Sequence, residues 1–236
     1  MNNSDYEDFY FGISDNKIHI CFFENGKNYL KKSINFEIPD TLSNNLNFKI
    51  ISNLLKNNIR MFEKRLGLFL TKGNISIQSK TYQSILFCTK NIFDEKKLDE
   101  KVVANLVKIG TQYFVKYEKR LSIIHIIINK YIIDGKNYSS MPRNTKFKKI
   151  ILELQLICLD KNLVDKVSNL FKENKIEINK IVSFEYAKKF LDNEDDKTMC
   201  ISAKKVLNGA NKSEIKIREI NQSKNTIFDR IFNFFD

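Results

Sequence analysis

The chain has 236 residues, 42% of them hydrophobic, and a formal net charge of +12. This composition is typical of a folded chain with one large or two small cores, and it excludes a disordered polymer. No run approaches the roughly 20 apolar residues of a membrane-spanning helix, and the N-terminal stretch MNNSDYEDFY is unlike a secretory signal. We therefore expect a cytoplasmic protein.

The positive charge by itself favours a nucleic-acid partner, because Lys and Arg neutralise phosphates and release counterions. Only six of the 40 basic residues are Arg, however, and the lysines are spread along the chain in runs no longer than pairs such as Lys148-Lys149. This distribution favours an ordinary solvated surface, and it also suits an anionic membrane. We expect no nucleic-acid partner, and a basic nucleic-acid-binding protein is kept as the alternative function.

The N-terminal part of the chain predicts a three-stranded meander followed by a helix and a strand. The three strands are expected at 9–13, 17–23 and 27–36. A helix over 43–66 is predicted by the helical spacing of its apolar residues, which are Leu46, Ile50, Leu54, Leu55, Ile59 and Phe62. Gly67 is placed to end this helix, and a short strand is expected at 74–78.

The middle of the chain predicts a second unit in the order strand, helix, strand, strand. The first strand is expected at 82–89, and Asp94 is expected to cap a helix whose buried face carries Leu98, Val102, Val103, Leu106 and Ile109. Two apolar runs follow, LSIIHIIINKYIID and FKKIILELQLICL, and their β-branched residues favour a buried hairpin. Asp134-Gly135 tolerates positive φ, and Pro142 blocks a helix across the connection.

The last part of the chain predicts a helix, a strand and a tail. Asp160 is expected to cap a helix carrying Leu163, Val164, Val167, Leu170 and Phe171, and a strand is expected at 176–184. A polar tether from about 208 to 224 precedes KNTIFDRIFNFFD, whose helical stripe is formed by Ile227, Phe228, Ile231, Phe232, Phe234 and Phe235. Such a stripe is expected to bind a membrane interface, and packing on the protein's own core is the alternative.

The string IIHIIINKYIIDG, with His125, Asp134 and Gly135 in register, resembles the inserted subdomain called 1C or SHS2 of the actin-like cell-division protein FtsA. It is similar, more distantly, to the pilus-assembly relative PilM. The strand NKIEINKIVSFEY, with Glu185 at the family's Glu, and the segment ISAKKVLNGA also match, whereas Asn144 and Phe147 replace the two glycines that follow the proline in the family. An ordinary β-hairpin outside this family is the alternative.

The resemblance implies an α/β (α+β) fold, with a single actin-like, ribonuclease-H-like lobe and an inserted SHS2 subdomain. The lobe is expected at 1–79 and 160–207, the subdomain at 80–159, and the tether with its amphipathic helix at 208–236. We expect a truncated and degenerate relative, because the sequence lacks the second actin lobe that an FtsA needs.

The first turn of the family reads D-I-G-T-S-K-V and binds nucleotide phosphate, whereas residues 12–18 here read G-I-S-D-N-K-I. Gly12 stands at the family's Asp, Ser14 at its Gly, and Asp15 puts a carboxylate where a phosphate would sit, with Lys17 after it. A carboxylate desolvated beside a phosphate is unfavourable without a compensating cation. We expect a degenerate phosphate turn that binds no nucleotide.

No catalytic, cofactor or metal residue is assigned. His19 and His125 are flanked by apolar strand residues, and the four cysteines match no metal spacing and are expected to be buried free thiols. The residues and the resemblance together predict a non-enzymatic adaptor, peripheral on the inner membrane, with divisome or other envelope proteins and anionic lipid as partners. Self-association is left open, and a PilM-like pilus-assembly scaffold is a further alternative.

Overall fold

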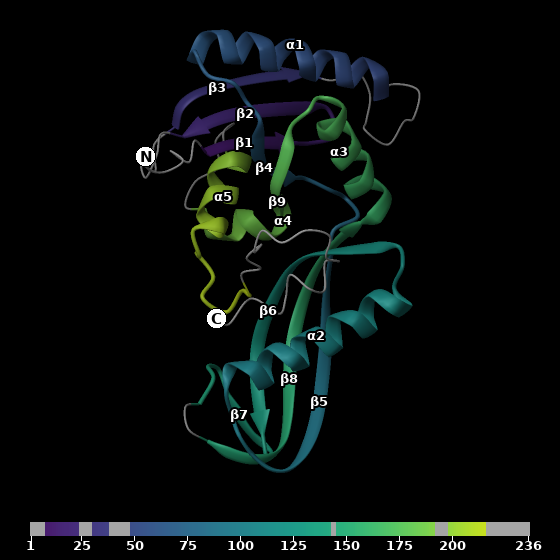
Figure 1. The fold of residues 1–236 in the computed structure, drawn as a ribbon, viewed down its shortest axis with the longest axis vertical. Coiled ribbons are helices and arrows are strands. Elements are labelled where there is room, and N and C mark those ends of the chain that lie inside the picture. Colours follow the sequence, from purple (N-terminus) through teal and green to yellow (C-terminus); the bar gives the residue numbers. More distant parts are fainter. Residues whose placement is uncertain (1–7, 24–29, 38–47, 143–144, 192–197, 216–236) are drawn as a thin grey trace, which may run out of the picture. The chain divides into compact units, whose positions relative to one another are not determined.

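The computed structural model describes residues 8–23, 30–37, 48–142, 145–191 and 198–215 (Figure 1). The chain divides into two compact units. Unit 1 comprises Met1–Tyr82 and Leu159–Ala210, and unit 2 comprises Gln83–Cys158 and Asn211–Asp236. Each unit contains its own sheet, so the predicted mixed α/β fold, with a meander-based lobe and a separate strand–helix–strand–strand unit, is confirmed.

The sheet of unit 1 has the strand order β3-β2-β1-β4-β9 in the described part of the chain. The strands are β1 (Asp8–Ile13), β2 (Lys17–Phe23), β3 (Leu30–Glu37), β4 (Lys72–Ile77) and β9 (Glu177–Ser183). The first three strands form the predicted antiparallel meander, whereas β4 runs parallel to both β1 and β9. β4 lies between β1 and β9, and its residues after Lys72 are buried, as the residues of parallel strands normally are.

Helices cover both faces of this sheet. They are α1 (Phe48–Leu66), α3 (Lys161–Glu173), α4 (Phe184–Ala187), the short 3₁₀ helix η2 (Lys188–Phe190) and α5 (Thr198–Leu207). Successive residues of β1 point to opposite faces. Phe11 packs edge-on against Phe171 of α3, with ring centroids 4.7 Å apart, whereas Gly12 faces Met199 of α5. Thus α3 and α5 lie on opposite faces of β1.

The helix ends of unit 1 follow the sequence signals. Asp160 caps α3, because its carboxylate accepts a hydrogen bond from the backbone N–H of Leu163 at 3.1 Å. Gly67 ends α1 with a φ of 72° and donates its N–H to the carbonyl of Glu63 at 2.8 Å. One apolar position was wrong: Ile50 is 49% exposed, and Ile51 occupies the core instead.

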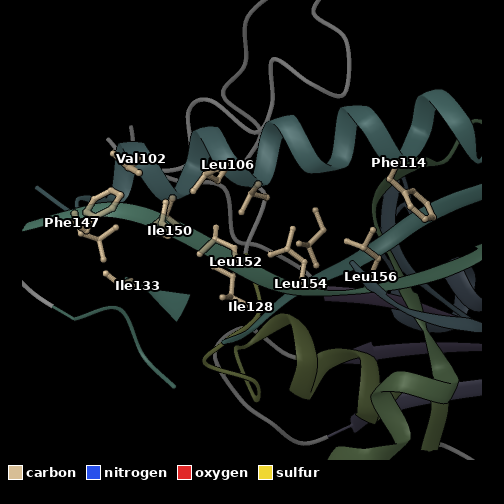
Figure 2. Close-up of a cluster of buried hydrophobic side chains, with 14 of the residues drawn as sticks. Val102, Leu106, Phe114, Ile128, Ile133, Phe147, Ile150, Leu152, Leu154 and Leu156 are labelled. Atoms are coloured by element: carbon tan, nitrogen blue, oxygen red, sulfur yellow. The ribbon is translucent and has the colours of Figure 1, made fainter. Parts of the chain in front are cut away.

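Unit 2 is a sheet in the order β5-β8-β6-β7 with one long helix. Its elements are β5 (Gln83–Lys97), α2 (Glu100–Tyr117), β6 (Leu121–Ile133), β7 (Lys136–Tyr138) and β8 (Lys146–Asp160). Figure 2 shows the core between the helix and the strands, where Val102, Leu106 and Phe114 of α2 point toward the sheet. The predicted order is confirmed, with the short β7 as an addition between the two long strands.

The predicted N-cap of α2 was wrong. Asp94 lies inside β5, which continues to Lys97 because it pairs with β8 along most of its length. The cap is Asp99, whose carboxylate accepts from the N–H of Val102 at 2.8 Å. Ile109 was also misplaced, since it is 47% exposed on α2.

The turn after β6 is confirmed at Asp134-Gly135, where φ is 46° and 84°. It joins β6 to β7, and the strand neighbouring β6 on its other side is β8. The Asp134 carboxylate links the β6–β7 turn to β8, because it accepts a hydrogen bond from the backbone N–H of Lys149 at 2.7 Å. The two long apolar strands are therefore neighbours, as predicted, although β7 lies between them in the sequence.

The expected tether begins later than Asn208. Within unit 2, Ile128 donates its N–H to Ser213 and Ile215 donates its N–H to Ile126, at 3.0 and 2.9 Å. Glu214 also accepts from the buried His125, with Nδ1 2.6 Å from its carboxylate oxygen. Residues 213–215 thus extend the edge of β6, so this part of the expected tether belongs to the fold of unit 2.

The cysteine prediction is confirmed for three residues and wrong for one. Cys21, Cys158 and Cys200 are buried free thiols, and burial together with the nearby Glu118 raises the pKa of Cys158 to about 12. Cys88 is exposed, because it lies on the face of β5 that points away from α2.

Candidate functional site

A pocket of about 310 Å³ opens in unit 1 where β1 and β4 end and α3 begins. The carboxyl ends of parallel strands and the N-terminus of a helix are where α/β proteins commonly hold anions. The pocket is lined by Ile13, Ser14, Asp15, Ile77, Gln78, Ser79, Lys80, Thr81, Asp160, Asn162, Leu163 and Lys166. It is the candidate ligand site of this unit.

The β1–β2 turn closes on itself. Ser14 donates its backbone N–H to the carbonyl of Lys17 at 2.9 Å, and the Ser14 hydroxyl lies 3.2 Å from both that carbonyl and the Lys17 N–H. A phosphate-binding turn needs backbone N–H groups that point at the ligand. In this turn the N–H groups of Ser14 and Lys17 are both engaged inside the turn.

The charged side chains of the pocket balance one another. Asp15 pairs with Lys80 at 3.0 Å, and both side chains are well exposed, so this pair contributes little to stability. Asp160 is the N-cap of α3, so its carboxylate already occupies the end of the helix dipole that attracts anions. Lys166 of α3 supplies the second lysine of the lining. Two carboxylates and two ammonium groups leave no surplus positive charge for a polyphosphate.

Gly12 is held by packing. It is buried in β1, and a Cβ at this position would lie 2.9 Å from Cβ and 3.4 Å from Sδ of Met199. The carboxylate that the FtsA-like families carry here would meet α5 directly. The Gly at the predicted degenerate turn therefore has a structural reason, which is the close approach of α5 to β1.

The structure brings only part of the predicted turn to the pocket. Ser14 and Asp15 line it, whereas Gly12 lies behind them under α5 and Lys17 is half-buried at the start of β2. Sequence reasoning missed the roles of Lys80 and Lys166, because they come from a loop and a helix that the fold alone places beside β1. The sequence predicted Asp160 as an N-cap, but it did not predict that Asp160 lies beside the β1–β2 turn.

Glu185 of α4 lies beside the loop that lines the pocket. Its carboxyl group accepts a hydrogen bond from the backbone N–H of Ser79, and burial raises its pKa above the ordinary value. Its Oε2 atom is buried and has no hydrogen-bond partner among the described residues. The sequence matched Glu185 to the Glu of a family motif, and the structure places it within hydrogen-bonding reach of the pocket wall.

The described residues were searched for metal sites and for membrane-spanning helices. Among the described residues, no group of three or more His, Cys, Asp or Glu side chains is arranged to hold a metal ion. No helix in the same ranges is both long enough and apolar enough to cross a bilayer. The predicted membrane stripe of Ile227, Phe228, Ile231, Phe232, Phe234 and Phe235 lies outside the described residues.

No family model matches the chain, and no curated protein matches it. Several solved structures are similar. A PilM–PilN type IV pilus biogenesis complex has a TM-score of 0.48 and 10% identity, over 79% of this chain and 50% of that one. The cytoplasmic domain of EpsL, an inner-membrane component of the type II secretion system of Vibrio cholerae, has a TM-score of 0.38 and 6% identity, over 77% and 58%.

A third similar structure is a protein from Bacteroides thetaiotaomicron described as having an actin-like ATPase fold and unknown function. Its TM-score is 0.30 and its identity 17%, over 78% of this chain and 54% of that one. The chain thus spans between 50% and 58% of the solved chains compared here.

Proposed function

We propose that this chain is a non-catalytic adaptor of the FtsA type. It docks at the cytoplasmic face of the inner membrane and contacts cell-division or envelope proteins through unit 2. The observation that carries the proposal is the pocket at the β1–β2 turn, which keeps the position of a phosphate site but not its chemistry. The adaptor role follows because a lobe that binds no nucleotide can still act by binding other proteins.

The pocket argues against ATP on three counts. The turn N–H groups are engaged within the turn, Asp160 occupies the N-terminus of α3, and Met199 fills the space of the missing carboxylate at position 12. A bound triphosphate would add several negative charges beside Asp15 and Asp160, which is strongly unfavourable without further cations. We therefore propose that unit 1 binds no nucleotide.

A thermal-shift titration with Mg-ATP tests this part of the proposal. A ligand present at a hundred times its dissociation constant stabilises the folded state by about 2.7 kcal/mol, which is easily measured as a change in Tm. We expect no shift at millimolar Mg-ATP. A saturable shift that is lost in Lys80→Ala and Lys166→Ala would contradict the proposal and assign the pocket to nucleotide.

Membrane attachment is assigned to the segment 225–236. The spacing predicts that, in a helix, the Ile and Phe residues would form a stripe on one side, with Asp229, Arg230 and Asn233 on the other. Each large apolar side chain that enters the interface contributes on the order of 1.5 to 3 kcal/mol before the cost of ordering the helix is subtracted. Replacing two such residues should therefore be enough to release the protein from the membrane.

Sedimentation with anionic vesicles tests the attachment. The double variant Phe228→Asp with Phe232→Asp is expected to abolish binding and leave the Tm nearly unchanged, because a segment that binds the membrane adds nothing to the packing of the cores. Asn233→Ser, on the polar side of the same segment, leaves the charge unchanged and is the matched control. A lowered Tm in the Phe variant, with no vesicle binding by the wild type, would show that the stripe packs on the protein itself.

A PilM-like scaffold for pilus assembly or secretion is the second candidate. The strand–helix–strand–strand order of unit 2 supports it as well as the division adaptor, because both families carry this subdomain. Crosslinking in the source cell, followed by identification of the proteins bound to unit 2, separates the two. Division proteins would favour the FtsA-type adaptor, and pilus or secretion components would favour the scaffold.

A further inference from the structure

One side of the C-terminal half of α2 carries an exposed apolar stripe. Ile109, Tyr113 and Tyr117 are 47%, 57% and 64% exposed. They are spaced four residues apart, so they lie on one side of the helix. Val102 and Leu106, seven residues before Ile109 and Tyr113, point into the core (Figure 2), so the stripe continues the flank of the buried face toward the end of the helix, where it is exposed. We call Ile109, Tyr113 and Tyr117 the outer stripe.

The aromatic part of the outer stripe is ordered. The rings of Tyr113 and Tyr117 have their centroids 4.6 Å apart at an interplanar angle of 41°. The ammonium group of Lys116 lies 5.5 Å from the centroid of the Tyr117 ring. An amine beside an aromatic face keeps its charge near the apolar surface. The stripe therefore ends in two adjacent, mutually tilted tyrosine rings with a cation beside them.

The charges around the outer stripe are predominantly positive. Lys116 of α2 lies beside Tyr117, and Lys119 and Arg120 follow the helix directly. The nearby carboxylate of Glu118 lies 3.5 Å from the Arg120 guanidinium, so it offsets one of these charges. A helix face with tyrosines, an aliphatic residue and lysines is complementary to a surface that is apolar below and negatively charged above.

We propose that the outer stripe of α2 is a second membrane-contact surface, which binds an anionic lipid leaflet. Tyr113, Tyr117 and Ile109 enter the headgroup region, and Lys116 and Lys119 lie at the level of the lipid phosphates. The inference rests on the proposed membrane adaptor and adds a site in unit 2 to the segment 225–236. From Ile109 to Tyr117 the helix rises about 12 Å, which permits all three side chains to enter one flat surface.

Lipid is favoured over a nucleic acid by the residue types. Tyrosine rings are suited to the membrane interface because one end is apolar and the other is polar. Ile109 offers no stacking surface to a base, but it suits the acyl boundary. Lysine supplies most of the positive charge here, whereas bidentate phosphate recognition favours arginine.

A lipid contact at α2 would also compensate for the acidic residues of the segment 225–236. The segment 225–236 carries Asp229 and Asp236, whereas interfacial helices favour Lys and Arg. Two weak contacts on one chain increase the overall affinity, because the second binds at a high effective concentration once the first is bound. The basic outer stripe supplies the anionic selectivity that the segment lacks.

The test is sedimentation of the full chain with vesicles of phosphatidylcholine, with and without phosphatidylserine. Tyr113→Ser with Tyr117→Ser is expected to weaken binding to the anionic vesicles about tenfold. Lys116→Glu changes two units of charge and is expected to weaken it roughly 25-fold, about fivefold per unit, whereas Lys116→Arg should bind like the wild type. Leu86→Ser is the control, because Leu86 is 60% exposed on β5, on the sheet face away from α2.

The outcomes separate this inference from the proposed function. If the wild type binds vesicles and the Tyr variant binds equally well at unchanged Tm, the outer stripe is not a lipid contact and the adaptor stands. If the wild type ignores anionic vesicles at low salt, both proposals fall. Loss of a single-stranded DNA shift in the Tyr variant, with vesicle binding intact, would assign the stripe to nucleic acid and overturn the inference.

Discussion

Position 12 offers the sharpest test of the packing between β1 and α5 behind the pocket. Gly12→Ala adds a Cβ that would lie 2.9 Å from the Cβ of Met199, a separation that real Cβ atoms essentially never show. The neighbouring atom is the first atom of a helical side chain, so it moves only if α5 moves. Overpacking of this kind costs about 1–3 kcal/mol.

The consequence for stability follows from this cost. For a chain of 150–250 residues, 1 kcal/mol changes the Tm by about 2–4 °C, so Gly12→Ala should lower it by roughly 3–10 °C. Gly12→Asp should lower it further, because it also buries a carboxylate, which costs several kcal/mol when unpaired. Since total stability is typically about 5–15 kcal/mol, the Asp variant is expected to be partly unfolded at 37 °C.

Differential scanning fluorimetry of Gly12→Ala, Met199→Gly and the double variant checks the mechanism. Met199→Gly removes the opposing Cβ, so Gly12→Ala should cost about 1 kcal/mol less in that background than in the wild type. An unchanged Tm for Gly12→Ala would refute the packing argument. A Mg-ATP shift gained by Gly12→Asp would show that the missing carboxylate alone separates this lobe from a nucleotide-binding one.

Three further predictions concern the other elements. Ile127→Asp, which buries a charge at a position that is 4% exposed, should unfold unit 2, and urea denaturation followed by circular dichroism checks it. Asp99→Ala should cost about 1 kcal/mol by removing the α2 cap, whereas Asp94→Ala should cost nothing measurable in the same denaturation. Burial raises the folded pKa of Glu185 above its ordinary value of 4.5, so its contribution to stability is fully present below that pH and is lost as pH rises through the folded pKa. Glu185→Gln should therefore flatten the dependence of Tm on pH between the two values, and an unaltered slope would contradict this.

Asp94 and Asp99 show where local sequence reasoning stopped. Both precede the same apolar helical pattern, and either could cap it by residue type. The choice was made by β8, which pairs with β5 as far as Lys97 and holds Asp94 in a strand. Ile109 was misplaced for a related reason: it lies next to the buried Gly110 on the helix but is itself exposed, so only the position of the sheet decides its exposure.

The sequence by itself determined the type and order of the elements, because apolar periodicity, β-branched runs, the Asp160 cap and the Asp134-Gly135 turn are signals that neighbouring residues carry. It also predicted a degenerate phosphate turn at Gly12, Ser14 and Asp15. Only the tertiary structure decided which distant residues meet there, placing Met199 against Gly12 and Lys80 beside Asp15. The physical reason is that such contacts depend on how helices and loops cross the sheet. The residues next to a side chain in the sequence do not determine which distant residue the fold brings to it.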